Sequence, residues 1–163
     1  MEVAMQYLFM AIFAAVVTGL DQLSKLWIVI NIPLDTQQPV IPGLFHLTYN
    51  QNTGAAFSSF QGMRWLFVVI FVLFALAIIW EFSKNRMGFT TFEKWCIVAI
   101  FAGGLGNMID RLFLGYVVDM IEVEFIRFPV FNVADSFITC GCILLMIHLI
   151  FFNHEFWKDN KKK

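Results

Sequence analysis

The sequence predicts an all-α integral membrane protein with four transmembrane helices and a small outward-facing β cradle. Three observations lead to this fold class. Hydrophobic residues make up 60% of the 163 residues and charged residues only 14%, whereas soluble domains carry roughly 45–50% apolar and about 25% charged residues. Four apolar stretches are long enough to cross a hydrocarbon core of about 30 Å. The two segments that join them on one side alternate polar and apolar residues, and the length suits one membrane domain over residues 1–163.

Each predicted helix is a run of predominantly apolar residues near the length that a membrane span requires. The first run continues well past a signal-peptide core and has no Lys or Arg before it, so we expect it to be retained as a helix. Tryptophans near the ends of the runs indicate an interfacial aromatic belt, with scattered core tryptophans as the alternative; they are Trp27, Trp65, Trp80, Trp95 and Trp157. The predicted helices are about 5–30, 65–82, 92–114 and 131–152.

The segments 31–64 and 115–130 are predicted to be partly extended. Residues 45–50 alternate large apolar with polar side chains, and residues 122–125 do the same. A period of two is typical of strands with one buried face. Prolines punctuate both segments, at Pro33, Pro39, Pro42 and Pro129. We expect a small sheet on the outer membrane surface, with a short amphipathic helix between Phe57 and Met63.

The distribution of Lys and Arg predicts the orientation in the membrane. Short cytoplasmic loops carry an excess of these residues. One side carries a basic turn and a lysine tail, at Lys84, Arg86, Lys94, Lys158, Lys161, Lys162 and Lys163. The other side carries only Arg64, Arg111 and Arg127. Both termini are therefore predicted to be cytoplasmic, and segments 31–64 and 115–130 to face outward.

Charge and side-chain chemistry exclude several classes of ligand. A net charge of −1 supplies no strong field for nucleic acid. Cys96, Cys140 and Cys142 lie in apolar runs, and an odd number of cysteines argues for packing residues rather than disulfides. The histidines at 46, 148 and 154 have no zinc spacing. The sequence therefore offers no cluster of metal ligands.

Asp21 and Lys25 are charged residues inside the first predicted helix. Their i, i+4 spacing puts them on one helix face. A charge in a membrane helix is costly, so it usually has a partner or a task. We interpret Asp21 and Lys25 as a structural ion pair that fixes helix packing. The alternative is a lysine that activates a nucleophile, but no serine constellation surrounds it.

Two further stretches combine small and polar residues. Residues 52–57 read Asn-Thr-Gly-Ala-Ala-Phe, in which Asn52 and Gly54 indicate a close backbone approach or a simple turn. Residues 103–111 contain three glycines that favour close helix contact in lipid. Asn107 and Asp110 are three residues apart and share a face. Asp110 and Arg111 diverge, so Arg111 is expected to reach a carbonyl or lipid headgroups.

The paired aspartates Asp119 and Asp135 are the candidate chemistry. Asp119 follows two valines at the start of the second outward segment, and Asp135 lies in Phe-Asn-Val-Ala-Asp at the start of the last helix. Two carboxylates near one water can act together, one taking a proton and the other donating one. The alternative is that Asp135 caps the last helix and Asp119 ends a strand.

Five stretches follow one another along nearly the whole chain. Through these five stretches the chain resembles the bacterial lipoprotein signal peptidases, also called signal peptidase II. They are Asp21-Gln22-Leu23-Ser24-Lys25, Asn52-Thr53-Gly54-Ala55-Ala56-Phe57, Gly106-Asn107-Met108-Ile109-Asp110-Arg111, Val117-Val118-Asp119 and Phe131-Asn132-Val133-Ala134-Asp135.

The resemblance implies an intramembrane aspartic endopeptidase of the bacterial cytoplasmic (inner) membrane. It implies removal of the signal peptide from diacylglyceryl-modified prolipoproteins, just before the lipidated cysteine. Asp119 and Asp135 would form the catalytic dyad toward the outer face, without metal or cofactor. Membrane lipids and lipid-modified prolipoproteins are the implied partners, with no nucleic acid and no obligate protein partner evident. The residues implied to line or brace the site are Asn52, Gly54, Asn107, Asp110, Arg111, Asn132 and Ala134.

Three other functions are alternatives to a peptidase of this kind. A proton-coupled transporter also needs intramembrane Asp and Lys, but four helices without an inverted repeat suit alternating access poorly. A non-enzymatic membrane subunit would use its polar residues for assembly alone. A presenilin-type peptidase needs Gly-x-Gly-Asp, and residues 104–107 read Gly-Leu-Gly-Asn. Cleavage by the purified, reconstituted protein separates a peptidase from a transporter or a subunit.

Overall fold

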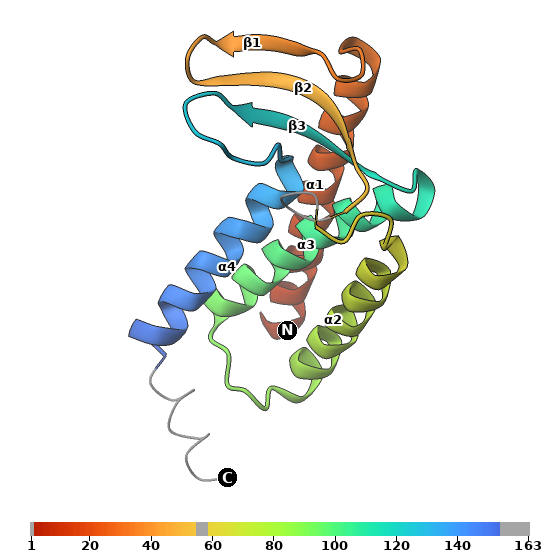
Figure 1. The fold of residues 1–163 in the computed structure, drawn as a ribbon. Helices are drawn as coiled ribbons and strands as arrows, with labels where there is room; N and C mark the ends of the chain where they lie inside the picture. Colours follow the sequence, from red (N-terminus) through yellow and green to blue (C-terminus); the bar gives the residue numbers. More distant parts are fainter. Residues whose placement is uncertain (1, 55–58, 154–163) are drawn as a thin grey trace.

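A computed structural model describes residues 2–54 and 59–153 of the chain. In these ranges four long helices carry a three-stranded sheet at one end (Figure 1). All four helices are long and apolar enough to cross a membrane, so the chain is a multi-pass membrane protein. In chain order the elements are α1 (Glu2–Asn31), β1 (Gln37–Ile41), β2 (Phe45–Asn52), α2 (Arg64–Lys84), α3 (Thr91–Phe113), β3 (Val117–Val123) and α4 (Val133–Phe151).

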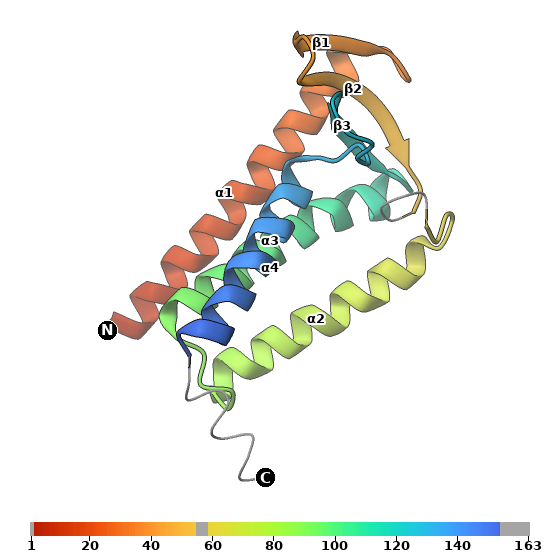
Figure 2. The same ribbon diagram turned by 60° about the vertical axis from the view of Figure 1, so that its left-hand side comes forward.

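The predicted fold class is confirmed: each predicted span overlaps one helix, and the extended segments form a small sheet. The sheet is antiparallel, in the order β1-β2-β3. Phe45 pairs with Val123, and Asn50 pairs with Asp119. The sheet lies at one end of the bundle, while the start of α1 and the α2–α3 turn lie at the opposite end (Figures 1 and 2).

Two details of the outward segments differ from the prediction. Strand β3 begins earlier than expected and ends at Val123, so Phe125 is not extended. The chain turns there because Glu124 donates its N–H to Leu44 and accepts from the N–H of Gly43.

The short helix predicted between Phe57 and Met63 is also wrong in its described part, where residues 59–62 form turns. Phe60 and Gly62 have positive φ values of 56° and 74°, which a right-handed helix excludes. Phe57 lies outside the described residues.

Helix α3 is the centre of the bundle and contacts α1, α4 and α2 (Figure 2). Its glycines permit the close approach: a Cβ on Gly103 would collide with the carbonyl of Ala134, at the start of α4. Further along α4, a Cβ on Gly141 would lie 2.8 Å from the Ile100 side chain. Small residues therefore bring α3 and α4 together over most of their length, as expected for helices packed in lipid.

A small apolar core joins the sheet to the end of α1. Ile28 and Ile32 of α1 pack with Tyr49 of β2 and with Val118 and Met120 of β3. Side chains alternate along a strand. Asp119, between Val118 and Met120, therefore points to the other face of β3, together with Val117. This alternation places one candidate carboxylate over the helix bundle.

The outer surface of the bundle is apolar, as a lipid-facing surface should be. In α2 the only described residue that is buried is Glu81. Trp27, Trp65 and Trp80 are exposed near helix ends, as the predicted aromatic belt requires. Trp95 instead packs edge-on against Phe13 of α1 at 5.4 Å. Trp157 lies outside the described residues.

Candidate active site

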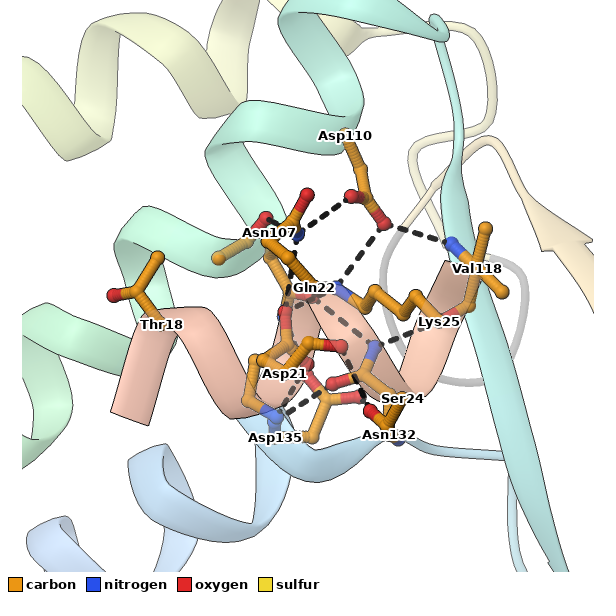
Figure 3. Close-up of polar contacts among 12 residues, drawn as sticks. Thr18, Asp21, Gln22, Ser24, Lys25, Asn107, Asp110, Val118, Asn132 and Asp135 are labelled. Carbon is orange, nitrogen blue, oxygen red and sulfur yellow. Dashed lines mark hydrogen bonds and ion pairs between the residues drawn. The ribbon is translucent and has the colours of Figure 1, made fainter. Parts of the chain in front are cut away.

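A buried polar cluster crosses from α1 to α3 just below the sheet (Figure 3). Lys25 Nζ lies 2.8 Å from Asp21 and 3.1 Å from Asp110. It also donates to Asn107 Oδ1 at 2.9 Å. An ammonium group has three hydrogens, so all of the donor capacity of Lys25 is used. The two residues predicted to pair do lie together, within a network larger than an i, i+4 pair.

The other oxygen of Asp21 reaches the last helix. Asp21 Oδ1 accepts the backbone N–H of Ala134 at 2.9 Å, in the first turn of α4. A carboxylate is favourable there because the first N–H groups of a helix have no intrahelical partner and the helix dipole is positive at that end. Gly106 provides the space, since a Cβ there would collide with the Asp21 carboxylate. Asp21 thus ties α1, α3 and α4 at one point.

Asp110 holds the start of β3. Its Oδ2 accepts the backbone N–H of Val118 at 3.0 Å, one residue before Asp119. Its Oδ1 accepts from Gln22 Nε2 at 2.9 Å. Asp110 is itself buried, with 2% of its surface exposed. The carboxylate therefore positions the backbone from which Asp119 projects.

Asp119 receives two side-chain amides. Asn52 Nδ2 donates to its Oδ2 at 2.8 Å, and Asn132 Nδ2 donates to its Oδ1 at 2.8 Å. Burial is the main cause that raises the pKa of Asp119, the carboxylate of Asp135 adds to the rise, and the two amides oppose it, with a net pKa of about 7. A carboxyl group with such a pKa can gain or lose a proton near neutral pH.

Asp135 lies in the first turn of α4, at the third helical position, and belongs to a capping box. Asn132 is the N-cap: its side chain accepts from the N–H of Asp135 at 2.9 Å. In return Asp135 Oδ2 accepts the N–H of Asn132 at 3.2 Å. Asp135 Oδ1 accepts from Asn107 Nδ2 at 2.7 Å. Asp135 therefore does take part in capping α4, from the N3 position, while Asn132 is the N-cap residue, so the capping alternative stays open.

The two aspartates share partners and face one cavity. Asn132 contacts both, through its side chain to Asp119 and through its backbone N–H to Asp135. The cavity of about 700 Å³ is lined by both carboxylates. The fold thus brings together two acidic side chains that are 16 positions apart in the sequence, one from a strand and one from a helix.

The rest of the cavity wall is mostly apolar. Helix α2 contributes Phe67, Ile70, Phe71 and Phe74, and α4 contributes Ile138 among others. Phe67 and Phe74 are about two turns apart, so this wall extends about 10 Å along α2.

Arg111 stands at the junction of the polar and apolar parts of the cavity. It donates to the carbonyls of Gly54 at 2.8 Å and Asn107 at 3.2 Å. Its guanidinium lies 4.5 Å from the centre of the Phe67 ring. The expected contact with a carbonyl is present. Gly54 in turn donates its N–H to Asn52 Oδ1, which orients the amide that reaches Asp119.

All of the residues that the sequence implicated are therefore found around one cavity or one network. Gln22 was missed, although it contacts Asp21, Gly106 and Asp110. Its place inside the Asp21–Lys25 stretch was the available signal. The described residues contain no group of three or more His, Cys, Asp or Glu side chains that could hold a metal.

The fold and the site define the class as a polytopic membrane enzyme with two acidic side chains that face one cavity below a small sheet. Two solved bacterial membrane enzymes, determined by the in meso method, have this fold. One aligns with a TM-score of 0.80 and 34% identity over 87% of each chain. The other has a TM-score of 0.78 and 33% identity over 89% of this chain and 94% of that chain.

The sequence comparisons define the family. Residues 13–151 match the family described as signal peptidase (SPase) II. The lipoprotein signal peptidase of Streptococcus pyogenes serotype M1 is 48% identical over 86% of this chain and 88% of its own. That of serotype M3 (strain SSI-1) is 47% identical over the same shares. The chain belongs to the signal peptidase II family, as the resemblance implied.

Proposed function

We propose that this protein is an aspartic endopeptidase that removes the signal peptide from diacylglyceryl-modified prolipoproteins, cutting just before the lipidated cysteine. The observation that carries the proposal is the placement of Asp119 and Asp135 on one cavity, linked through Asn132. Membership of a peptidase family supports the reaction. The acidic pair supports the catalytic type.

The chemistry follows from one proton shared by two carboxyl groups. Two carboxyl groups at close range cannot both ionise, because their negative charges would repel each other. One of them therefore stays protonated. The ionised carboxylate takes a proton from a water molecule. The oxygen of that water bonds to the scissile carbonyl carbon at the same time. The protonated carboxyl donates to the carbonyl oxygen, which yields a neutral gem-diol. The C–N bond then breaks as the dyad returns a proton to the leaving nitrogen and accepts one from a diol hydroxyl.

The surrounding amides and charges hold this pair in place. Asn52, Asn107 and Asn132 each donate to a carboxylate of the dyad. Donors fixed before the reaction need no reorganisation during it. Arg111 holds the Gly54 carbonyl, and thereby the Asn52 amide, at the cavity wall. We assign positioning to these residues and reserve proton transfer for the two aspartates.

The cavity suits a substrate that is itself lipid-bound. The cavity is lined both by the two carboxylates and by apolar side chains of α2, so an acyl chain or an apolar signal-peptide segment can remain out of water while a peptide bond reaches the carboxylates. A diacylglyceryl cysteine is held at the membrane surface by its acyl chains. A dyad at the junction of sheet and helices acts at that depth.

The direct test is cleavage by the purified protein reconstituted in lipid vesicles. A diacylglyceryl-modified prolipoprotein peptide should be cut before the modified cysteine, and a matched peptide with an unmodified cysteine should be cut much more slowly. Mass spectrometry of both products locates the bond. Equal cleavage of the two peptides contradicts the proposed requirement for lipid. The absence of any cleavage contradicts the proposed function itself.

The pH dependence of cleavage should carry the signature of Asp119. Its pKa of about 7 is raised chiefly by burial. Because the working dyad holds one proton, activity should fall as pH rises through this value and the proton is lost. The acid limb reports protonation of the second carboxyl, and both limbs belong to the pair. The measurement is kcat/KM from pH 5 to 9, with unfolding followed over the same range as a control. A profile that stays flat to pH 9 contradicts a shared proton.

We also propose that the chain lies in the bacterial cytoplasmic membrane with both termini inside and the dyad toward the outer face. The sheet and the α2–α3 turn lie at opposite ends of the bundle (Figure 1). The end with the α2–α3 turn carries the basic residues Lys84, Arg86 and Lys94. The positive-inside rule favours the cytoplasm for such an end.

Single cysteines report this orientation in a variant that lacks the three native ones. An impermeant thiol reagent applied to intact cells should label Gln37→Cys and Glu124→Cys but not Lys84→Cys, which should react only after the membrane is opened. Labelling of Lys84→Cys alone in intact cells reverses the orientation. Exposure of Gln37 and of Glu124 makes both positions accessible.

A further inference from the structure

Gln22 makes polar contacts that the proposed reaction does not use directly. It directly follows Asp21 on α1, is half-buried, and points toward α3 (Figure 3). Its amide nitrogen lies 2.9 Å from Asp110 Oδ1, 3.1 Å from the carbonyl of Gly106 and 3.3 Å from Asp21 Oδ2. These three partners are all acceptors. Gln22 thus acts in this site as a donor.

The charges of the cluster explain why a neutral donor is needed. Asp21 and Asp110 are both buried and both contact Lys25, so one cation faces two carboxylates. All donor capacity of Lys25 is used by Asp21, Asp110 and Asn107. A buried carboxylate oxygen without a donor is costly. The Gln22 amide satisfies Asp110 Oδ1 without adding another charge.

The contact reaches the dyad in two steps. Gln22 holds one oxygen of Asp110, and the other oxygen holds the N–H of Val118. Asp119 is the next residue along β3. A rotation of the Asp110 carboxyl would release the Val118 N–H and with it the backbone position from which Asp119 projects.

We propose that Gln22 is a positioning residue for the reaction, which acts through Asp110 and Val118 to hold Asp119 in place. The inference rests on the proposed function, because it gives Asp119 a catalytic role. It also makes a chemical claim of its own. The donor hydrogens of Gln22 matter, and its shape alone does not suffice.

The test compares Gln22→Met with Gln22→Glu in reconstituted vesicles. Methionine keeps the length and loses the amide, so kcat should fall about 10-fold or more, which corresponds to about 1.4 kcal/mol of barrier, with KM changed less. Glutamate keeps the shape but replaces the donor by oxygens beside Asp21 and Asp110. It should be at least as damaging as methionine at neutral pH. A role in shape alone predicts the reverse order.

Gln6→Met is the matched control, since Gln6 lies on the same helix and its buried amide nitrogen has no hydrogen-bond partner among the described residues. It should leave kcat within twofold of the parent.

The pH profile of Gln22→Met separates a positioning role from a loss of folded enzyme. A loosened Asp119 is less buried, so the alkaline limb should move to lower pH in Gln22→Met, whereas a loss of folded protein scales the profile without moving it. If Gln22→Met does not insert, Gln22→Asn takes its place, because the shorter amide no longer reaches Asp110.

A double-variant cycle tests the route through Asp110. On an Asp110→Asn background, Gln22→Met should cost less than twofold in residual activity, because the contact that it removes is already altered. A full 10-fold cost on that background refutes the route. An unchanged kcat and pH profile in Gln22→Met, with Asp119→Asn inactive, refutes this inference and leaves the proposed function intact. An active Asp119→Asn refutes the proposed function instead.

Discussion

Asp119→Asn and Asp135→Asn are each expected to abolish cleavage while the protein remains folded and inserted. Asparagine keeps the shape of aspartate and most of its hydrogen bonding, but it cannot exchange a proton in the dyad. General acid–base assistance is typically worth about 10²–10⁴-fold. Both carboxyls serve one reaction, so the double variant should be hardly worse than either single variant. The measurement is the turnover of a diacylglyceryl-modified peptide in vesicles, with thermal unfolding of each variant beside it.

Asp35→Asn is a matched control for the chemical change. Asp35 lies on the same side of the bundle as the dyad, is exposed, and has a left-handed φ of 58° that asparagine adopts readily. Its substitution should leave turnover unchanged. A folded and fully active Asp119→Asn or Asp135→Asn protein would falsify the aspartic mechanism.

The helix-capping alternative makes a different forecast for Asp135. Asn132 is the N-cap, and Asp135 answers it from the third helical position. Asparagine at 135 still offers one oxygen, either to the N–H of Asn132 or to the amide of Asn107. A purely structural Asp135 therefore predicts a modest loss of stability with turnover largely kept. The dyad predicts the same modest loss of stability together with the loss of turnover, so turnover separates the two readings.

Lys25→Met should produce the largest loss of stability of any single change discussed. Lys25 is 3% exposed and is the one cation that contacts both Asp21 and Asp110 among the described residues. Its removal leaves two buried carboxylates without a counter-charge, a change that costs about 3–5 kcal/mol in buried ion pairs. The free energy of unfolding in detergent or lipid should fall by that amount, and turnover should fall with it.

Lys84→Met is the control, because Lys84 is exposed at the end of α2 and its substitution should change stability by less than about 0.5 kcal/mol. The double variant Lys25→Met/Asp110→Asn should recover part of the loss, since it removes one of the unpaired charges. If Lys25→Met unfolds like the parent protein, the cluster does not need its cation, and the pairing seen in the structure contributes little.

Much of this arrangement could be predicted from sequence because the membrane restricts the possibilities. A span needs about 20 apolar residues and internal satisfaction of every backbone group, so four apolar runs became α1, α2, α3 and α4. Strand β2 was readable because residues 45–50 alternate. Polar residues inside such runs are rare, which makes Asp21, Lys25 and Asp110 conspicuous in the sequence.

Local patterns failed where a long-range contact decides the conformation. The alternation of residues 122–125 predicted an extended strand through all four positions. Glu124 instead forms hydrogen bonds with Gly43 and Leu44 in the β1–β2 turn. The segment before α2 looked amphipathic, yet Phe60 and Gly62 have left-handed backbones. Neither outcome follows from the spacing of apolar residues.

The sequence by itself determined the class of protein, the spans and the two aspartates that carry the proposed chemistry, because each depends on residue type and on order along the chain. Tertiary structure alone decided how the aspartates meet. Asp119 comes from a strand anchored by Asp110 and Asp135 from a helix anchored by Asp21, and Asn132 joins them. These contacts link residues 8 to 113 positions apart. Only packing that lets α3 approach α1 and α4 at Gly103 and Gly106 brings them within hydrogen-bonding distance.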